Sequence, residues 1–131
     1  MPNFALEQIN FNETKAPVYY LHRDGVCLID SFIGMVKSDP KYEPLLSDLY
    51  AIVRRAANGE SPPSKLLSKV KGQDHAWEAR KGDIRMYIYR EWDGPIIVIG
   101  GDKNTQDGDL EKLKTLIKEF KNADETNVIA R

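Results

Sequence analysis

The sequence predicts a two-layer α+β domain, in which helices pack on one face of a small, mainly antiparallel twisted sheet. The first observation is the order of the expected elements, which is strand, helix, helix, three strands and helix. The second is that each long expected helix carries a single apolar stripe, which has to be buried against a sheet face. The third is the length of 131 residues, which suffices for one domain that buries a core without metals or disulfides.

The N-terminal third is expected to hold an extension, one strand and a short helix. Residues 1–16 are polar with scattered phenylalanines and show no sustained period, so we interpret them as an N-terminal extension that is poorly ordered or lies at an edge. The stretch KAPVYYLHRDG is typical of a strand that ends at the turn signal Asp24-Gly25. The next run, VCLIDSFIGMVK, keeps helical spacing and stops at Asp39-Pro40, which favours a short helix over a strand.

A longer amphipathic helix is predicted from Tyr42, because large aliphatic residues recur on one stripe until the stop signal Asn58-Gly59. The adjacent prolines Pro62 and Pro63 prevent the helix from continuing. A connector that carries lysines then leads into the sheet.

Three strands are predicted between Trp77 and Gln106, with the turn WDGP before the last one. The run IIVIGG is apolar on both faces, which suits a central strand. Because side chains alternate along a strand, the middle strand has one apolar and one polar face. We expect the helices to cover the apolar face and to leave the other toward solvent or a ligand. The apolar face carries Ile84, Met86 and Ile88, and the opposite face carries Arg85, Tyr87 and Tyr89.

The last predicted element is a helix capped by Asp107 or Asp109, whose leucines, Ile117 and Phe120 form a stripe that faces the core. Residues 123–131 are expected to form a flexible tail.

Cellular location is indicated by features that the sequence lacks. The single cysteine, Cys27, cannot form an internal disulfide, and the N-terminus has neither the basic nor the apolar region of a signal peptide. We therefore expect a cytoplasmic protein. No apolar run approaches the roughly 20 residues that a membrane-spanning helix needs, so no membrane partner is expected.

Charge is distributed unevenly along a chain whose net charge is only −1. Residues 1–53 hold four Lys and Arg against seven Asp and Glu, residues 54–90 hold nine against four, and residues 91–131 hold six against nine. The middle of the chain is therefore a basic band, although such clusters are often solvated surface. A uniformly basic surface, as in a strong non-specific nucleic-acid binder, is excluded.

The arginines and tyrosines of the predicted open face suit single-stranded RNA. Guanidinium groups bind phosphate oxygens, and tyrosine rings stack on bases. Cleavage of RNA without a metal needs a base for the 2'-OH, cations for the charged phosphorane and an acid for the leaving oxygen. Candidates for these catalytic roles are Arg80, Arg85, His75, Tyr87, Tyr89 and Lys103, and candidates for RNA binding are Lys65, Lys69, Lys71, Lys81, Arg90 and Asn104.

Structural alternatives exist for these candidates. Tyr87 and Tyr89 can simply pack, because tyrosine is favoured in strands. Arg85 can pair with Glu78 across the hairpin, as cross-strand charges commonly do. His75 is equally compatible with a solvated turn beside Asp74. No metal site and no cofactor are expected, because His22 and His75 lack ligand-like spacing to each other and to Cys27.

The chain resembles the RelE/ParE superfamily of type II toxins, and within it a HigB-like branch of phage origin. The resemblance starts at VYYLHRDGVCLIDSF and covers residues 17–122, which would form the RelE-like toxin domain. Its most specific pieces are WEAR-x-GDIR-x-Y, a following strand that ends in KNTQ, and a final helix. It implies a two-layer RelE-like fold.

The resemblance also implies a function, that of a toxin that cleaves mRNA on the ribosome and is held inactive by a cognate antitoxin protein. It would use the 2'-OH as the nucleophile. By position, Arg85 matches the arginine that contacts the scissile phosphate, Arg80 matches a strand arginine, and Lys103 matches the basic residue that closes the last strand.

The sequence departs from the family pattern at several positions. Ala76 and Glu78 stand where some members carry lysines, Asn104 replaces a second basic residue, and no tyrosine lies in the final helix. Two alternatives therefore stay open beside the nuclease. One is a toxin that inhibits gyrase, or an inactive relative that only binds an antitoxin. The other is a regulator at the host–phage interface without toxicity.

Overall fold

The computed structural model describes residues 2–11, 14–90, 92–123 and 126–129. Eight strands form one sheet in the order β4-β5-β6-β7-β2-β1-β8, and β3 pairs with β2 off this path. The pairings are antiparallel except for β2 with β7 and β1 with β8. The elements are β1 (Phe4–Ile9), β2 (Val18–Arg23), β3 (Val26–Cys27), α1 (Asp30–Lys37), α2 (Glu43–Ala57), β4 (Leu67–Lys69), β5 (Ala76–Lys81), β6 (Ile84–Tyr89), β7 (Ile96–Asp102), α3 (Gln106–Lys121) and β8 (Thr126–Ile129).

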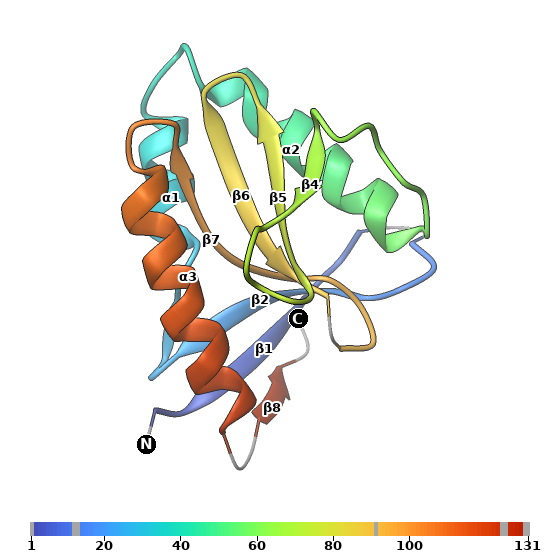
Figure 1. Ribbon diagram of the computed structural model, residues 1–131, viewed down its shortest axis with the longest axis vertical. Helices are drawn as coiled ribbons and strands as arrows, with labels where there is room; N and C mark the ends of the chain where they lie inside the picture. Colours follow the sequence, from blue (N-terminus) through green and yellow to red (C-terminus); the bar gives the residue numbers. More distant parts are fainter. Residues whose placement is uncertain (1, 12–13, 91, 124–125, 130–131) are drawn as a thin grey trace.

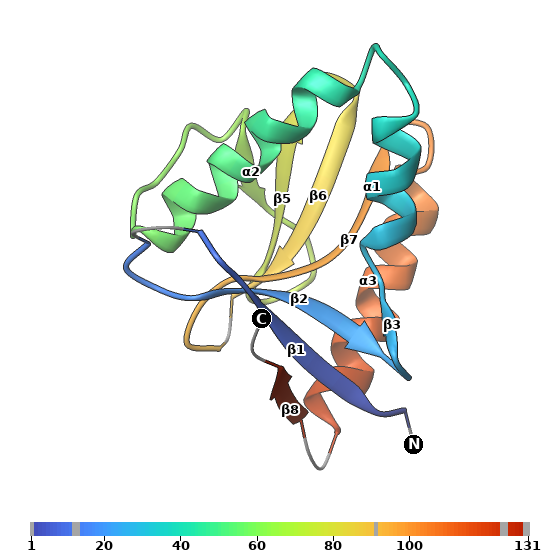
Figure 2. The same ribbon diagram turned by 180° about the vertical axis from the view of Figure 1, so that it is seen from behind.

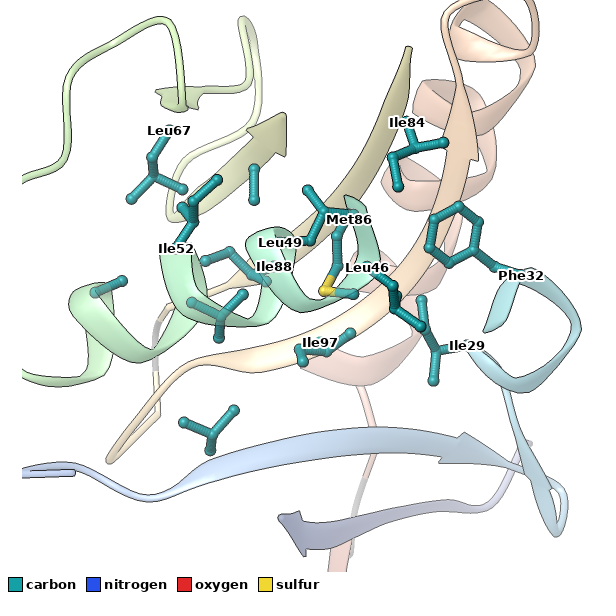
Figure 3. Close-up of a cluster of buried hydrophobic side chains, with 14 of the residues drawn as sticks. Ile29, Phe32, Leu46, Leu49, Ile52, Leu67, Ile84, Met86, Ile88 and Ile97 are labelled. Atoms are coloured by element: carbon teal, nitrogen blue, oxygen red, sulfur yellow. The ribbon is translucent and has the colours of Figure 1, made fainter. Parts of the chain in front are cut away.

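Helices α1 and α2 cover one face of the sheet, as Figure 2 shows with both helices in front of β5, β6 and β7. The core on this side contains Ile84, Met86 and Ile88 together with the buried stripes of both helices. Figure 3 shows Leu46 and Leu49 of α2 lying next to Met86. The predicted α+β class, the mainly antiparallel sheet and the apolar face of the middle strand are confirmed.

The expectation that all helices pack on one face is wrong. Helix α3 lies on the opposite side of the sheet from α2 (Figure 1), and its buried residues, among them Leu113 and Phe120, join Tyr87 and Tyr89 in a second core. The protein therefore has three layers, helix, sheet and helix. An amphipathic stripe reports that a helix is buried on one side, but it does not report which sheet face covers that side.

Residues expected to lie outside the domain extend the sheet. Strand β1 lies between β2 and β8, and Phe4 and Leu6 are buried, with exposed fractions of 3% and 0%. The expected poorly ordered or edge-lying extension is therefore replaced by an inner strand over residues 4–9. In the expected flexible tail, residues 126–129 form β8, parallel to β1, while 124–125 and 130–131 lie outside the described residues.

The N-cap of α3, Thr105, lies two residues before the predicted cap Asp107 and four before the alternative cap Asp109. Thr105 occupies the N-cap position, but its side chain accepts no capping hydrogen bond from a backbone N–H of the first turn. Its hydroxyl instead donates to Asp109 Oδ2 at 2.6 Å. Both aspartates lie in the first turn, where negative charge is favourable for the helix dipole.

In the part of the chain that the structure describes, the longest apolar helical segment falls short of what a bilayer crossing requires.

Candidate functional site

The antiparallel hairpin of β5 and β6 places Arg80 directly opposite Arg85. Two positions along, Glu78 lies opposite Tyr87, and the four side chains share the sheet face that α3 covers. The resemblance motif WEAR-x-GDIR-x-Y is therefore one continuous hairpin. Its two arginines meet near the turn at Gly82-Asp83.

Arg85 is buried, with an exposed fraction of 8%. Its Nε lies 3.1 Å from Glu78 Oε1, in an ion pair whose side chains are each 10% exposed. Its Nη1 donates a hydrogen bond of 3.3 Å to the carbonyl of Asp83. The cross-strand pairing of Arg85 with Glu78, considered above as an alternative to phosphate binding, is confirmed, and it neutralises this guanidinium.

Glu78 also connects the hairpin to α3. Gln106, the first residue of the helix, donates from Nε2 to Glu78 Oε1 at 2.9 Å. The hydroxyl of Tyr87 donates to the same oxygen at 3.5 Å. A carboxylate that was expected only as a possible partner of Arg85 is thus the centre of a buried polar network. The signal in the sequence was a single acidic residue on the same face as two arginines.

The expectation that Arg85, Tyr87 and Tyr89 face solvent or a ligand is wrong, because α3 packs over them. Tyr87 is fully buried, and burial, reinforced by the nearby Glu78 and Asp109 carboxylates, raises the pKa of its phenol. Tyr89 is 3% exposed and its ring meets Phe120 edge to face. The packing alternative is therefore confirmed for both tyrosines.

Arg80 differs from Arg85 in its surroundings. Its side chain is half-buried, and Nη2 makes one long hydrogen bond of 3.4 Å to Ser68 Oγ. Its Nε, like that of Arg85, is buried and makes no hydrogen bond. Among the described residues, no carboxylate forms an ion pair with Arg80. A guanidinium that is partly desolvated and not neutralised is suited to binding an oxyanion.

Lys103 lies at the same end of the sheet. Its amide donates to the carbonyl of Asp83 at 2.9 Å, and its ammonium group is 3.5 Å from the Asp83 carboxylate, with the side chain 58% exposed. Asn104 follows it in the exposed loop before α3, with its amide donating to Asp102 Oδ1 at 2.8 Å. Arg85 and Lys103 therefore both lie beside Asp83 at the turn end of the hairpin, where Arg80 lies opposite Arg85.

Other predicted residues lie elsewhere. His75 precedes β5 and Arg80 stands five positions further along, so at about 3.3 Å per residue they are roughly 16 Å apart. Arg90 lies beside His75, with its guanidinium 5.1 Å from the centre of the Trp77 ring. The remaining candidate lysines lie along the β4 edge of the sheet and at the end of β5. They are Lys65, Lys69 and Lys71 in and around β4, and Lys81, which pairs with Ile84.

Acidic residues offset the charge of these cations. Glu78 and Asp83, which lie within the basic band, are close to Arg85 and Lys103, and the end of β7 and the first turn of α3 add Asp102 and Asp109 nearby. A hollow of about 310 Å³ between α1, the end of β7 and the start of α3 has only these last two as charged lining residues. The hollow beside the nuclease candidates is therefore acidic.

A second cluster of polar side chains lies on the face of the sheet that carries α1. Glu7, His22 and Cys27 place one ligand-type atom each within 4.8 Å of one another. His22 Nε2 is 2.7 Å from Glu7 Oε1. Burial, followed by the carboxylates of Asp30 and Glu7, raises the pKa of the Cys27 thiol to about 12. The spacing argument above considered only His and Cys, and it missed this set because Glu7 was assigned to the extension.

Comparison of the chain with family models, with curated proteins and with solved structures gives no match. The resemblance to the RelE/ParE superfamily therefore rests on the order and spacing of the motifs alone.

Proposed function

We propose that the chain is the toxin of a type II toxin–antitoxin pair and cleaves mRNA on the ribosome without using a metal ion. The motif order WEAR-x-GDIR-x-Y, KNTQ and final helix supports this proposal. The observation that supports it most is the state of Arg80, which lies opposite Arg85, is partly exposed and has no carboxylate partner among the described residues.

In this proposal the scissile phosphate binds at the turn end of the hairpin and not along the sheet face. Arg80 grips the phosphate oxygens, because its fork of N–H donors matches two of them. The 2' oxygen attacks phosphorus and releases its proton to water, while Lys103, with 58% of its side chain exposed, donates a proton to the 5' oxygen as the P–O5' bond breaks. Arg85 is neutralised by Glu78 and contributes by holding β6 beside β5, where Arg80 lies. Tyr87 and Tyr89 support the strand and do not contact RNA.

A second candidate function is binding of an antitoxin without RNA cleavage. The Glu78 network favours it, because Glu78 neutralises the arginine that the resemblance assigns to the phosphate. Helix α3 also covers the tyrosines beside that arginine. In this case the chain would keep the fold and the antitoxin partner of the family but would not cleave RNA.

Controlled expression with mapping of transcript 5' ends separates the two candidates. A nuclease produces new mRNA 5' ends together with growth arrest, and Arg80→Ala lowers cleavage about 100-fold or more, as expected for removal of a group that stabilises transition-state charge. Lys37→Ala, an exposed lysine at the end of α1, is the matched control and cleaves as the parent does. Thermal unfolding verifies that both variants fold.

Two results would contradict RNA cleavage. One is growth arrest without new 5' ends, and the other is an Arg80→Ala variant that cleaves like the parent. Growth arrest with a DNA-damage response would indicate inhibition of gyrase. Normal growth together with binding to the product of a neighbouring small reading frame would support the antitoxin-binding candidate.

A further inference from the structure

Strands β1, β2 and β3 bring three ligand-type side chains to one face of the sheet. His22 on β2 lies directly opposite Cys27 on β3. Across the other edge of β2, Ala5 lies opposite His22 and Glu7 opposite Tyr20, so Glu7 is a diagonal neighbour of His22 on the same face. Figure 2 shows β1 and β3 flanking the end of β2, where the chain enters α1.

The three side chains are close enough to share one ion. Their ligand-type atoms all lie within 4.8 Å of one another. Zinc bonds of about 2.0–2.3 Å in tetrahedral geometry separate ligand atoms by roughly 3.3–3.8 Å. The required shifts are about 1 Å, within the reach of side-chain rotation. The ion would lie between Glu7 and His22 and replace their direct contact of 2.7 Å.

We propose that Glu7, His22 and Cys27 form a zinc-binding site. The carboxylate, imidazole and sulfur donors are the ligand types of zinc sites. Asp30, at the start of α1, lies within hydrogen-bonding reach of the Cys27 thiol. Asp30 does not belong to the set of mutually close ligand atoms, so a water molecule takes the fourth position. Binding releases the thiol proton to solvent and leaves a thiolate on the ion.

The charge of the cluster favours a cation. The Glu7 carboxylate and the Cys27 thiol lie beside a single imidazole, and the Asp30 carboxylate acts on the same thiol. The Glu7 side chain is 9% exposed and that of His22 17%, so water screens these charges poorly. Burial of a carboxylate is costly unless the charge is compensated. A divalent ion compensates the Glu7 carboxylate and the Cys27 thiolate together, which a neutral imidazole cannot do.

A cysteine nucleophile is the other chemistry that these residue types suggest, because His22 is oriented by Glu7 beside a thiol. The surroundings oppose it. A reactive thiolate needs a positive neighbour, and Cys27 instead has two carboxylates close by. A zinc ion reverses this electrostatic situation and deprotonates a coordinating thiol directly. The geometry therefore points to a metal ligand.

The test is zinc binding by untagged, metal-stripped protein under reducing conditions, measured by competition with a chromophoric chelator. We expect one zinc ion per chain. Cobalt substitution should give the near-ultraviolet charge-transfer band of a cobalt–thiolate bond. Cys27→Ser and His22→Gln each weaken binding by more than the roughly 10–100-fold typical of residues that only support ligands. His75→Gln, which replaces the other histidine of the chain, leaves binding unchanged.

Thermal unfolding with and without zinc keeps the proposal testable if a variant is destabilised. Zinc raises the Tm of the parent protein and of His75→Gln, and it does not raise the Tm of Cys27→Ser or Glu7→Gln. Equal zinc affinity in Cys27→Ser and the parent, or a cobalt complex without the thiolate band, overturns the proposal. The readout is metal binding, so the result is independent of the proposed RNA cleavage.

Discussion

Arg85 and Glu78 form a buried ion pair between neighbouring strands, with Arg85 Nε 3.1 Å from Glu78 Oε1 and both side chains 10% exposed. The same carboxylate oxygen accepts a hydrogen bond from Gln106 at the first position of α3. One side chain thus joins the two strands of the hairpin to the helix that covers them. The geometry that removes Arg85 from solvent is the same geometry that anchors α3.

We predict that Glu78→Gln destabilises the fold substantially. The substitution keeps the size of the side chain but leaves Arg85 as a buried charge without its counterion. Removing one partner of a buried pair costs about 3–5 kcal/mol of unfolding free energy. Denaturant unfolding measures this cost. Glu60→Gln is the control, because Glu60 pairs with Arg55 at the surface, where both side chains are more than 40% exposed, and an exposed pair contributes about 0–1 kcal/mol. Equal costs for the two variants would contradict the buried pair.

The second prediction concerns the third layer of the fold. Leu113 is fully buried in the core between α3 and the sheet. Leu113→Ala should lower the free energy of unfolding by about 2–5 kcal/mol, since it removes buried methyl groups and leaves a cavity. Lys114→Ala, at the adjacent exposed position, should change it by less than about 0.5 kcal/mol. A Leu113→Ala variant as stable as Lys114→Ala would mean that α3 does not pack on this face.

The third prediction distinguishes an inner strand from a poorly ordered extension at the N-terminus. Leu6 on β1 is 0% exposed, whereas Gln8 on the same strand is exposed. If β1 is part of the sheet, Leu6→Ala costs about 2–5 kcal/mol of unfolding free energy and Gln8→Ala costs far less. Denaturant unfolding of both variants measures the difference. Near-equal stability of the two would restore the interpretation of residues 1–16 as an extension.

Local pattern predicted the elements that depend on neighbouring residues. The alternation of Ile84, Met86 and Ile88 identified the apolar face of β6, because side chains of a strand alternate between its two faces. The stripe of α2 and its stop at Asn58 were also predicted, since both follow from helical periodicity and capping.

Relationships between distant segments could not be predicted in this way. The parallel pairing of β1 with β8 joins the two ends of the chain, and no local period encodes such a pairing. Whether Arg85 is exposed or buried depends on which face of the sheet α3 packs against. Both faces carry apolar residues that can cover the apolar stripe of α3. Glu7, His22 and Cys27 meet only because the register of three strands aligns them, which spacing in the sequence cannot reveal.

The last prediction concerns stability at alkaline pH. Burial, followed by a hydrogen bond of 3.1 Å to Asp93, raises the pKa of Tyr19 to about 12. Above pH 10 the unfolded chain loses this phenolic proton while the folded chain retains it. The folded state then binds more protons, so its stability falls as pH rises from about 10 to about 12. The maximum slope for one such group is about 1.4 kcal/mol per pH unit.

Tyr19→Phe removes this titration and should make the decrease in stability above pH 10 shallower. Denaturant unfolding of the parent and of Tyr19→Phe at several values between pH 8 and 12 measures the effect. The difference between the two proteins at pH 8 gives the contribution of the neutral hydroxyl and serves as the reference. Because Tyr87 and Tyr50 also have raised pKa values through burial, some alkaline destabilisation remains in the variant. Parallel stability curves for the two proteins would show that the Tyr19 phenol ionises at its ordinary pKa, and that neither burial nor Asp93 holds its proton in the folded state.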